Sequence, residues 1–365
     1  MKKFAAALII FMILAVSASV FVNIFSVKSL PSEGSALDRI ESSISLSIPF
    51  RENLSNLMDG IRYLSGVRRF ENIYIGSEGS LLPDIEKPSS RIFSVAENYL
   101  LSFAEKNQIK PYFMLVPTSS AILQQEINTF AAEDFYNQRN MINNIYSRFR
   151  GEVRTTDIYQ TLYDHRDEYI YYHTENLPTS LGGYYIYGEL CNRLGIEQNT
   201  MDSFSAAYVA HGFYGSLATD FFKPYSTPDF VSFYEYTEKI DTVIEYKNAN
   251  GTSGISKNFF IYDENKFSNK TDMVLGNLSP VIEITGSGSS GLSGSILIFG
   301  DESAKSWLPF LSTNYERITF VQLNSSNENL LSEIYPKDYD QVLFAYSTAD
   351  FAVGIDFEKL EYIES

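Results

Sequence analysis

One segment near the C-terminus, Ser295–Ser306, most constrains the fold. It contains the continuous apolar run Ile296–Phe299, which is typical of a strand buried on both faces of a parallel sheet. A tight turn follows, and a helix is predicted from about Ala304. Further apolar runs at Ile318–Leu323 and Gln341–Tyr346 continue this order of strand and helix. The pattern predicts an α/β fold, with a mostly parallel sheet flanked by helices, because right-handed crossovers join such units.

The rest of the chain fits this class and adds a different section. Before residue 200, hydrophobic periodicity predicts helices over 51–65, 91–107, 133–148 and 180–195, and strands over 72–76, 111–116 and 168–172. Thr179 or Ser180 is placed to cap the last of these helices, and Gly195 to end it. From Phe213 to about Ile284, short alternating runs are separated by polar turns, which indicates an inserted β-rich section.

Composition excludes several classes of function. The chain has 365 residues and a net charge of −17, and it lacks a long basic cluster, so we expect no nucleic-acid partner. Cys191 is the only cysteine, which rules out an intrachain disulfide or a thiolate metal site. The three histidines are not at metal-ligand spacing. The sequence therefore predicts neither a metal nor a cofactor.

The N-terminus predicts the compartment. Lys2 and Lys3 precede Phe4–Phe25, an uncharged stretch of about 22 residues that is long enough to cross a bilayer as a helix. We interpret residues 1–25 as a signal anchor, 26–50 as a linker and membrane-proximal segment, and 51–365 as one α/β domain. The expected location is the cell membrane, single-pass, with the bulk of the chain extracytoplasmic. A cleaved signal peptide is the competing interpretation, since small residues lie at Ala15–Ser19.

Several short motifs together resemble one family, although each alone is weak. They are Pro49-Phe-Arg51, Tyr74-Ile-Gly76 with Gly79, Leu115-Val-Pro-Thr118, Tyr171-Tyr172 with Thr174, Thr179-Ser-Leu-Gly182, Tyr184-Tyr185, Phe213-Tyr-Gly-Ser-Leu217 and Gly276-Asn277. Their order and spacing resemble the DHHW proteins, which are membrane-anchored extracytoplasmic proteins of Gram-positive bacteria and relatives of the SGNH-like alginate O-acetyltransferase proteins. The resemblance implies an SGNH-like fold over nearly the whole chain after the anchor.

The residues that carry the family's chemistry are replaced. Where the family reads Asp-His-His-Trp, this chain reads Glu175-Asn-Leu-Pro178, so that Leu177 stands in place of the presumed general base. Where the family reads Asp-Ser, this chain has Asp301 followed by Glu302. Acyl transfer through serine needs a hydroxyl and an imidazole that takes its proton. We therefore expect a degenerate, catalytically inactive site.

Three other arrangements of these residues stay open at this point. Ser303, His173 and Glu175 would form a shifted triad, which supports the alternative of a carbohydrate O-acetyltransferase or acetylesterase. Glu175 and Glu302 would act as a carboxylate pair on a glycosidic bond. Glu175, Asp301 and Glu302 would hold Ca²⁺ through oxygen ligands.

Four residues are candidates for ligand binding. Gly276 and Asn277 would offer a backbone N–H and a side-chain amide, Asn176 would bind a ligand hydroxyl, and Trp307 would stack on a sugar. A turn role for the first three and a core position for Trp307 are the competing interpretations. The leading hypothesis is an extracytoplasmic protein without catalysis that binds a cell-envelope polysaccharide, or a partner protein such as the membrane export or acetylation machinery.

Overall fold

The computed structural model describes residues 51–263, 265–289 and 291–364. The predicted anchor at 1–25 and linker at 26–50 lie outside the described residues. In the part of the chain that the structure describes, no helix is both long enough and apolar enough to span a bilayer. Helix α3 (Arg51–Leu64) belongs to a unit that ends at Val67 and is described by itself. It is amphipathic, and an ion pair of 2.9 Å joins Arg62 to Asp59 on it.

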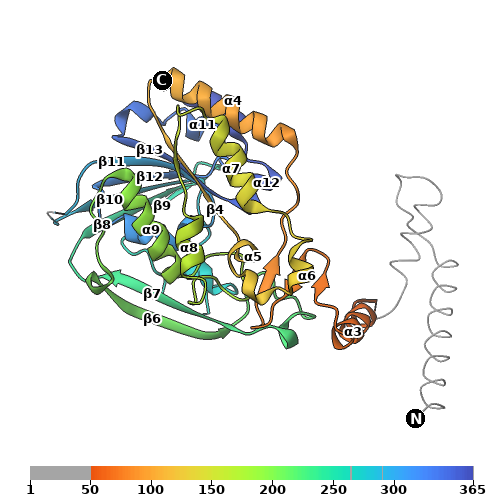
Figure 1. Ribbon diagram of the computed structural model, residues 1–365. Helices are drawn as coiled ribbons and strands as arrows, with labels where there is room; N and C mark the ends of the chain where they lie inside the picture. The colour runs from red at the N-terminus through yellow and green to blue at the C-terminus, as the bar shows by residue number, and fades with distance from the viewer. Residues whose placement is uncertain (1–50, 264, 290, 365) are drawn as a thin grey trace, which may run out of the picture. The chain divides into compact units, whose positions relative to one another are not determined.

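Residues 68–364 contain the main sheet (Figure 1), in which eight described strands follow the order β5-β4-β13-β11-β12-β10-β8-β9. Five neighbouring strands pair in parallel: β5 (Arg154–Thr156), β4 (Tyr112–Val116), β13 (Gln341–Ser347), β11 (Ser295–Gly300) and β12 (Arg317–Val321). Three pair antiparallel: β10 (Val281–Ser287), β8 (Asp241–Lys247) and β9 (Ser253–Ser256). The sheet is therefore mixed, and the prediction of parallel strands holds for its first five.

Both faces of the parallel strands are buried. In β11, Ile296 and Ile298 pack into one hydrophobic core, whereas Leu297 and Phe299 pack into the other. Side chains of a strand alternate between faces, so only an unbroken apolar run satisfies two cores at once. The first core includes α8 (Tyr159–Asp164), α9 (Ser180–Leu194) and α10 (Ala304–Leu311). The second includes α4 (Ser90–Asn107), α7 (Gln138–Arg148) and α12 (Thr348–Val353).

Helices α9 and α10 pack closely, which places the turn before α10. A Cβ atom at Gly183 would lie 1.9 Å from the backbone oxygen of Ser306, so only glycine allows this approach. Thr179 caps α9 by accepting a hydrogen bond from the N–H of Gly182, and Gly195 ends it in the left-handed conformation, both as predicted.

Further strands and short helices lie outside the main sheet. They are the three-stranded antiparallel sheet β1 (Arg69–Phe70), β2 (Ile73–Ile75) and β3 (Leu81–Pro83), the pair β6 (Phe204–Phe213) and β7 (Asp229–Tyr236), and helices α5 (Ser119–Ile122), α6 (Thr129–Ala132) and α11 (Glu328–Leu331). The β-rich part thus starts at Phe204 rather than Phe213. Its strands β8 and β10 join the main sheet instead of forming a separate module.

Two predicted elements are corrected. The strand over 168–172 is absent from the described residues, where Tyr171 makes only an isolated bridge to Pro178. The buried carboxylate of Asp229 accepts the N–H groups of His173 and Thr174, so a side chain takes the place of a neighbouring strand. The helix over 133–148 begins only at Gln138, because Asn137 caps it by accepting from the N–H of Asn140.

Candidate functional site

A cavity of about 320 Å³ lies at the carboxyl ends of β11 and β13. This is the edge at which open α/β sheets bind ligands. Six of the predicted site residues line it: Glu175, Asn176, Leu177, Asp301, Glu302 and Ser303. The two degenerate motifs, which are far apart in sequence, therefore meet in one cavity.

Asp301 holds the turn between β11 and α10 in place. Its Oδ1 accepts hydrogen bonds from the N–H of Ser303 at 2.9 Å and from the Ser303 hydroxyl at 2.5 Å. Its Oδ2 accepts from the N–H of Ser347 at the end of β13, also at 2.5 Å. A Cβ atom at Gly300 would lie 2.8 Å from the Ala345 carbonyl oxygen, so glycine is required before this turn. The Asp301 carboxylate therefore joins the turn after β11 to the end of β13.

Glu302 forms an ion pair with Lys305. The Lys305 side chain is only 5% exposed, and its Nζ also donates to Oδ1 of Asp272 at 2.8 Å. A buried ammonium group is costly unless it is paired and hydrogen-bonded, and these two carboxylates provide that. The carboxylate of Glu302 thus neutralises a buried cation.

Glu175 is buried, and its carboxylate accepts four hydrogen bonds. The donors are the N–H of Asn176 at 2.9 Å, the N–H and hydroxyl of Ser216 at 2.9 and 2.7 Å, and the side-chain amide of Asn269 at 2.6 Å. A carboxylate has about four acceptor positions, so none remains to orient an imidazole. Two residues after Glu175, the side chain of Leu177 packs against the hydrophobic core and offers no proton acceptor.

The shifted triad is not assembled. The Ser303 hydroxyl donates a hydrogen bond to Asp301, and the Glu175 carboxylate accepts hydrogen bonds from Ser216 and Asn269. His173 does not line the cavity, and its Nδ1 lies 3.7 Å from Oδ1 of Asp229. In the described chain, no hydrogen bond joins Ser303, His173 and Glu175 to one another.

The other predicted ligand-binding residues lie apart from the cavity. Trp307 is 0% exposed, so the prediction that it stacks on a sugar is corrected: its side chain faces the core between α10 and the sheet. Gly276 and Asn277 form a turn in which Gly276 has φ of 66°, and neither lines the cavity. Asn176 does line it, and its Oδ1 is buried without a hydrogen-bond partner in the described part of the chain.

Sequence reasoning missed Asp350, which lies beside Asp301 on the cavity wall. Asp350 is exposed as a whole residue, but desolvation of its carboxyl group by the surrounding protein, followed by the negative charge of Asp301 and a hydrogen bond with it, raises the pKa of Asp350 to about 7. Ser347 ends β13 and Asp350 follows it, just as Asp301 follows β11, so the shared carboxyl edge of the parallel strands was the available signal. Ser216 lies in the motif Phe213-Tyr-Gly-Ser-Leu217, which the sequence did not link to Glu175, and Asn269 lies in none of the motifs.

A calcium site at Glu175, Asp301 and Glu302 does not fit these contacts. Each carboxylate already has partners, namely Ser216 and Asn269, Ser303 and Ser347, and Lys305. Across the residues that the structure describes, no group of three or more His, Cys, Asp or Glu side chains is arranged to hold a metal ion.

The fold and this cavity define a mixed α/β protein whose site lies at the carboxyl edge of parallel strands. The chain belongs to the DHHW protein family, because the family model matches residues 89–321, which is more than half of its length. This confirms the family that its motifs resemble. No curated protein sequence matches the chain significantly.

Solved structures share the fold at low sequence identity. A DHHW family protein from Eubacterium siraeum has a TM-score of 0.63 and 20% identity, over 80% of this chain and 98% of that one. PatB1 from Bacillus cereus, solved with a sulfonyl adduct, has a TM-score of 0.64 and 15% identity, over 81% of this chain and 100% of that one. At these identities the similarity establishes a common α/β fold.

Proposed function

We propose that this chain is a cell-envelope DHHW protein that does not transfer acyl groups through serine. We propose that it binds glycan in the cavity lined by Glu175–Leu177 and Asp301–Ser303, called the motif cavity below. The observation that carries the proposal is the ion pair between Glu302 and the buried Lys305, at the position where the family has its serine. The cavity is formed, but a fixed salt bridge stands where the nucleophile is needed.

The inherited chemistry would lack two of its groups. No hydroxyl stands at position 302, and Leu177 cannot accept a proton. Loss of a triad member costs roughly 10⁴ to 10⁶ in turnover, which corresponds to about 5–8 kcal/mol of transition-state stabilisation. The carboxylate of Glu302 would also oppose the negative charge of a tetrahedral intermediate. Two such replacements in one cavity argue against acyl transfer.

The cavity wall supports binding of a polyhydroxylated ligand. Its volume of about 320 Å³ is within the range of ligand pockets, about 300–1,000 Å³. Thr271 and Ser347 contribute hydroxyl groups to the wall, and Asn176 contributes an Oδ1 that lacks a partner among the described residues. Hydroxyl groups of a sugar can both donate to such acceptors and accept from such donors. The predicted extracytoplasmic location would present this cavity to envelope glycans.

The catalytic part of the proposal is tested with a sulfonyl fluoride and with a chromogenic acetyl ester. Because PatB1 was solved with a sulfonyl adduct, such a reagent suits this fold. We expect no covalent adduct by mass spectrometry, and no hydrolysis above the level of the Glu302→Ala variant. An adduct on Ser303, or hydrolysis abolished by Ser303→Ala or His173→Ala, would overturn the proposed inactivity and favour the O-acetyltransferase or acetylesterase alternative.

The binding part is tested by hydrogen–deuterium exchange of the full chain in detergent micelles, with tetra-N-acetylchitotetraose as the probe. We expect slower exchange in peptides that contain Glu175–Leu177 and Asp301–Ser303, and loss of that effect in Asn176→Ala. Unchanged exchange in these peptides at millimolar probe would refute glycan binding in the motif cavity.

A further inference from the structure

A second hollow, of about 590 Å³, is lined mainly by the turn between β1 and β2, the segment that follows β3, and the segment between α6 and α7. None of the residues that line it also lines the motif cavity. About half of them, from Arg69 to Lys87, precede the residues matched by the family model. We propose that this hollow is a separate binding site for an uncharged oligosaccharide.

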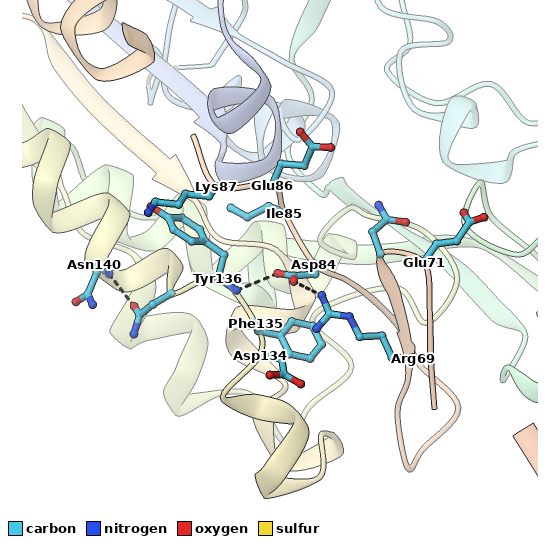
Figure 2. A pocket seen from close by; sticks show the side chains of 12 residues that line it. Arg69, Glu71, Asp84, Ile85, Glu86, Lys87, Asp134, Phe135, Tyr136 and Asn140 are labelled. Carbon is cyan, nitrogen blue, oxygen red and sulfur yellow. Dashed lines mark hydrogen bonds and ion pairs between the residues drawn. The ribbon is translucent and has the colours of Figure 1, made fainter. Parts of the chain in front are cut away.

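The floor of the hollow is held rigid by Asp84. Its Oδ2 pairs with Arg69 at 2.5 Å, and its Oδ1 accepts the N–H of Tyr136 at 3.0 Å. The guanidinium group of Arg69 also lies over the ring of Phe135, 5.0 Å from the centroid. Figure 2 shows these contacts between the β1–β3 side and the α6–α7 side. The two walls are therefore joined before any ligand arrives, which lowers the entropic cost of binding.

The rim carries polar groups that the fold does not use. In the described residues, the side chains of Glu71, Asn72, Glu86, Lys87 and Asp134 have no hydrogen-bond or ion-pair partner. Figure 2 shows Glu71 on one side of the hollow and Lys87 with Tyr136 on the other. The rim thus carries both hydrogen-bond acceptors and donors beside the half-buried rings of Phe135 and Tyr136.

The distribution of charge selects the class of ligand. Arg69 and Lys87 are positive, whereas Glu71, Asp84, Glu86 and Asp134 are negative. A phosphate or carboxylate ligand would meet four carboxylates, and an ammonium ligand would have to displace Arg69 from Asp84 or approach Lys87. An uncharged ligand with many hydroxyl or amide groups is not repelled by the carboxylates and does not have to displace Arg69. Its groups can form hydrogen bonds with both donors and acceptors of the protein. Its apolar ring face can lie against Phe135 or Tyr136.

A neighbouring hollow favours an extended ligand over a monosaccharide. It has a volume of about 280 Å³, and it shares Phe135, Tyr136 and Asn137 with the first. Its wall adds the polar side chains of Gln124 and Arg139. A chain of several sugar units can cross the shared residues and place one unit in each hollow.

The experiment uses hydrogen–deuterium exchange of the full chain in detergent micelles, with cellotetraose and tetra-N-acetylchitotetraose as separate probes. We expect at least one probe to slow exchange in peptides covering 69–87 and 133–140. The double variant Asn72→Ala/Lys87→Ala should reduce this protection at least five-fold. Both residues are exposed, so the variant is expected to fold. The matched control is Asn329→Ala/Lys337→Ala, two exposed residues that line neither hollow, and it should retain full protection.

The location of protection separates this inference from the proposed function. Protection confined to peptides containing Glu175–Leu177 and Asp301–Ser303 would overturn the second site and leave the motif cavity as the binding site. Protection of 69–87 and 133–140 alone would support the second site and count against the first. Absence of protection there with both probes at millimolar concentration, or protection unchanged in the double variant, would overturn the inference.

Discussion

The ammonium group of Lys305 lies 2.8 Å from the carboxylate of Asp272, and it also forms an ion pair with Glu302. Glu302 lies three residues before Lys305, in the turn that leads into α10, whereas Asp272 lies in the 3-10 helix Lys270–Met273 that precedes β10. This bridge connects the turn after β11 to a segment of the β-rich part of the chain. It explains how the carboxylate of Glu302 is accommodated on the cavity wall.

The first prediction concerns that bridge. Lys305→Met leaves two carboxylates without their cation, and because both are partly exposed we expect a loss of about 1–3 kcal/mol in the free energy of unfolding. Urea denaturation measures the loss. Lys239→Met is the control. The ion pair of Lys239 with Asp241 is exposed to solvent and screened by water and salt, so this substitution should change the free energy of unfolding by less than about 0.5 kcal/mol. Equal effects of the two variants would show that the Lys305 pairs contribute nothing.

The second prediction concerns pH. The pKa of Asp350 is raised from its ordinary value of 3.8 to about 7, so between these values the folded state holds a proton that the unfolded chain has released. The stability linked to this group is therefore complete below pH 4 and is lost as the pH rises through 7. Asp350→Asn cannot ionise, so relative to the parent protein it should gain stability from pH 5 to pH 8.

Thermal melting at pH 5, 6, 7 and 8 measures that difference. Groups distant from Asp350 titrate alike in both proteins, so the change in the gap between the two melting temperatures reports on Asp350 together with the neighbouring carboxyl of Asp301. A gap that stays constant across this range would contradict a raised pKa for Asp350.

The third prediction concerns the contact between α9 and α10. A Cβ atom at Gly183 would lie 1.9 Å from the Ser306 backbone oxygen, so Gly183→Ala should force the helices apart and cost about 3 kcal/mol or more. Gly254→Ala in the edge strand β9 is the control, because no atom lies within 4 Å of its added Cβ. Comparable unfolding midpoints for the two variants would show that the helices tolerate a side chain.

The fourth prediction uses the single tryptophan of the chain. Because Trp307 is 0% exposed, its fluorescence should be blue-shifted and poorly quenched by acrylamide in the folded protein. Neither cellotetraose nor tetra-N-acetylchitotetraose should change the quenching, since the ring cannot reach a ligand. Strong quenching that an oligosaccharide suppresses would instead place Trp307 at a binding surface.

Much of the fold follows from local patterns in the sequence. The apolar runs of β4 and β11 were predicted as buried parallel strands, and each places alternate side chains in two different cores. The capping residues Thr179 and Gly195 predicted both ends of α9. These features are local, because strand periodicity and helix capping depend on residues a few positions apart. The order of the motifs likewise predicted the DHHW family.

The sequence alone also predicted that Glu175 and Glu302 belong to one site, but only the tertiary structure decided what these two residues do. Glu302 pairs with Lys305, and Glu175 is bound by Ser216 and Asn269, loop residues distant in sequence. The segment 168–172 has strand-like composition, yet Asp229 takes the N–H groups that follow it. A buried charge or N–H group must find a partner, and the partner can come from any part of the chain that the fold brings within reach.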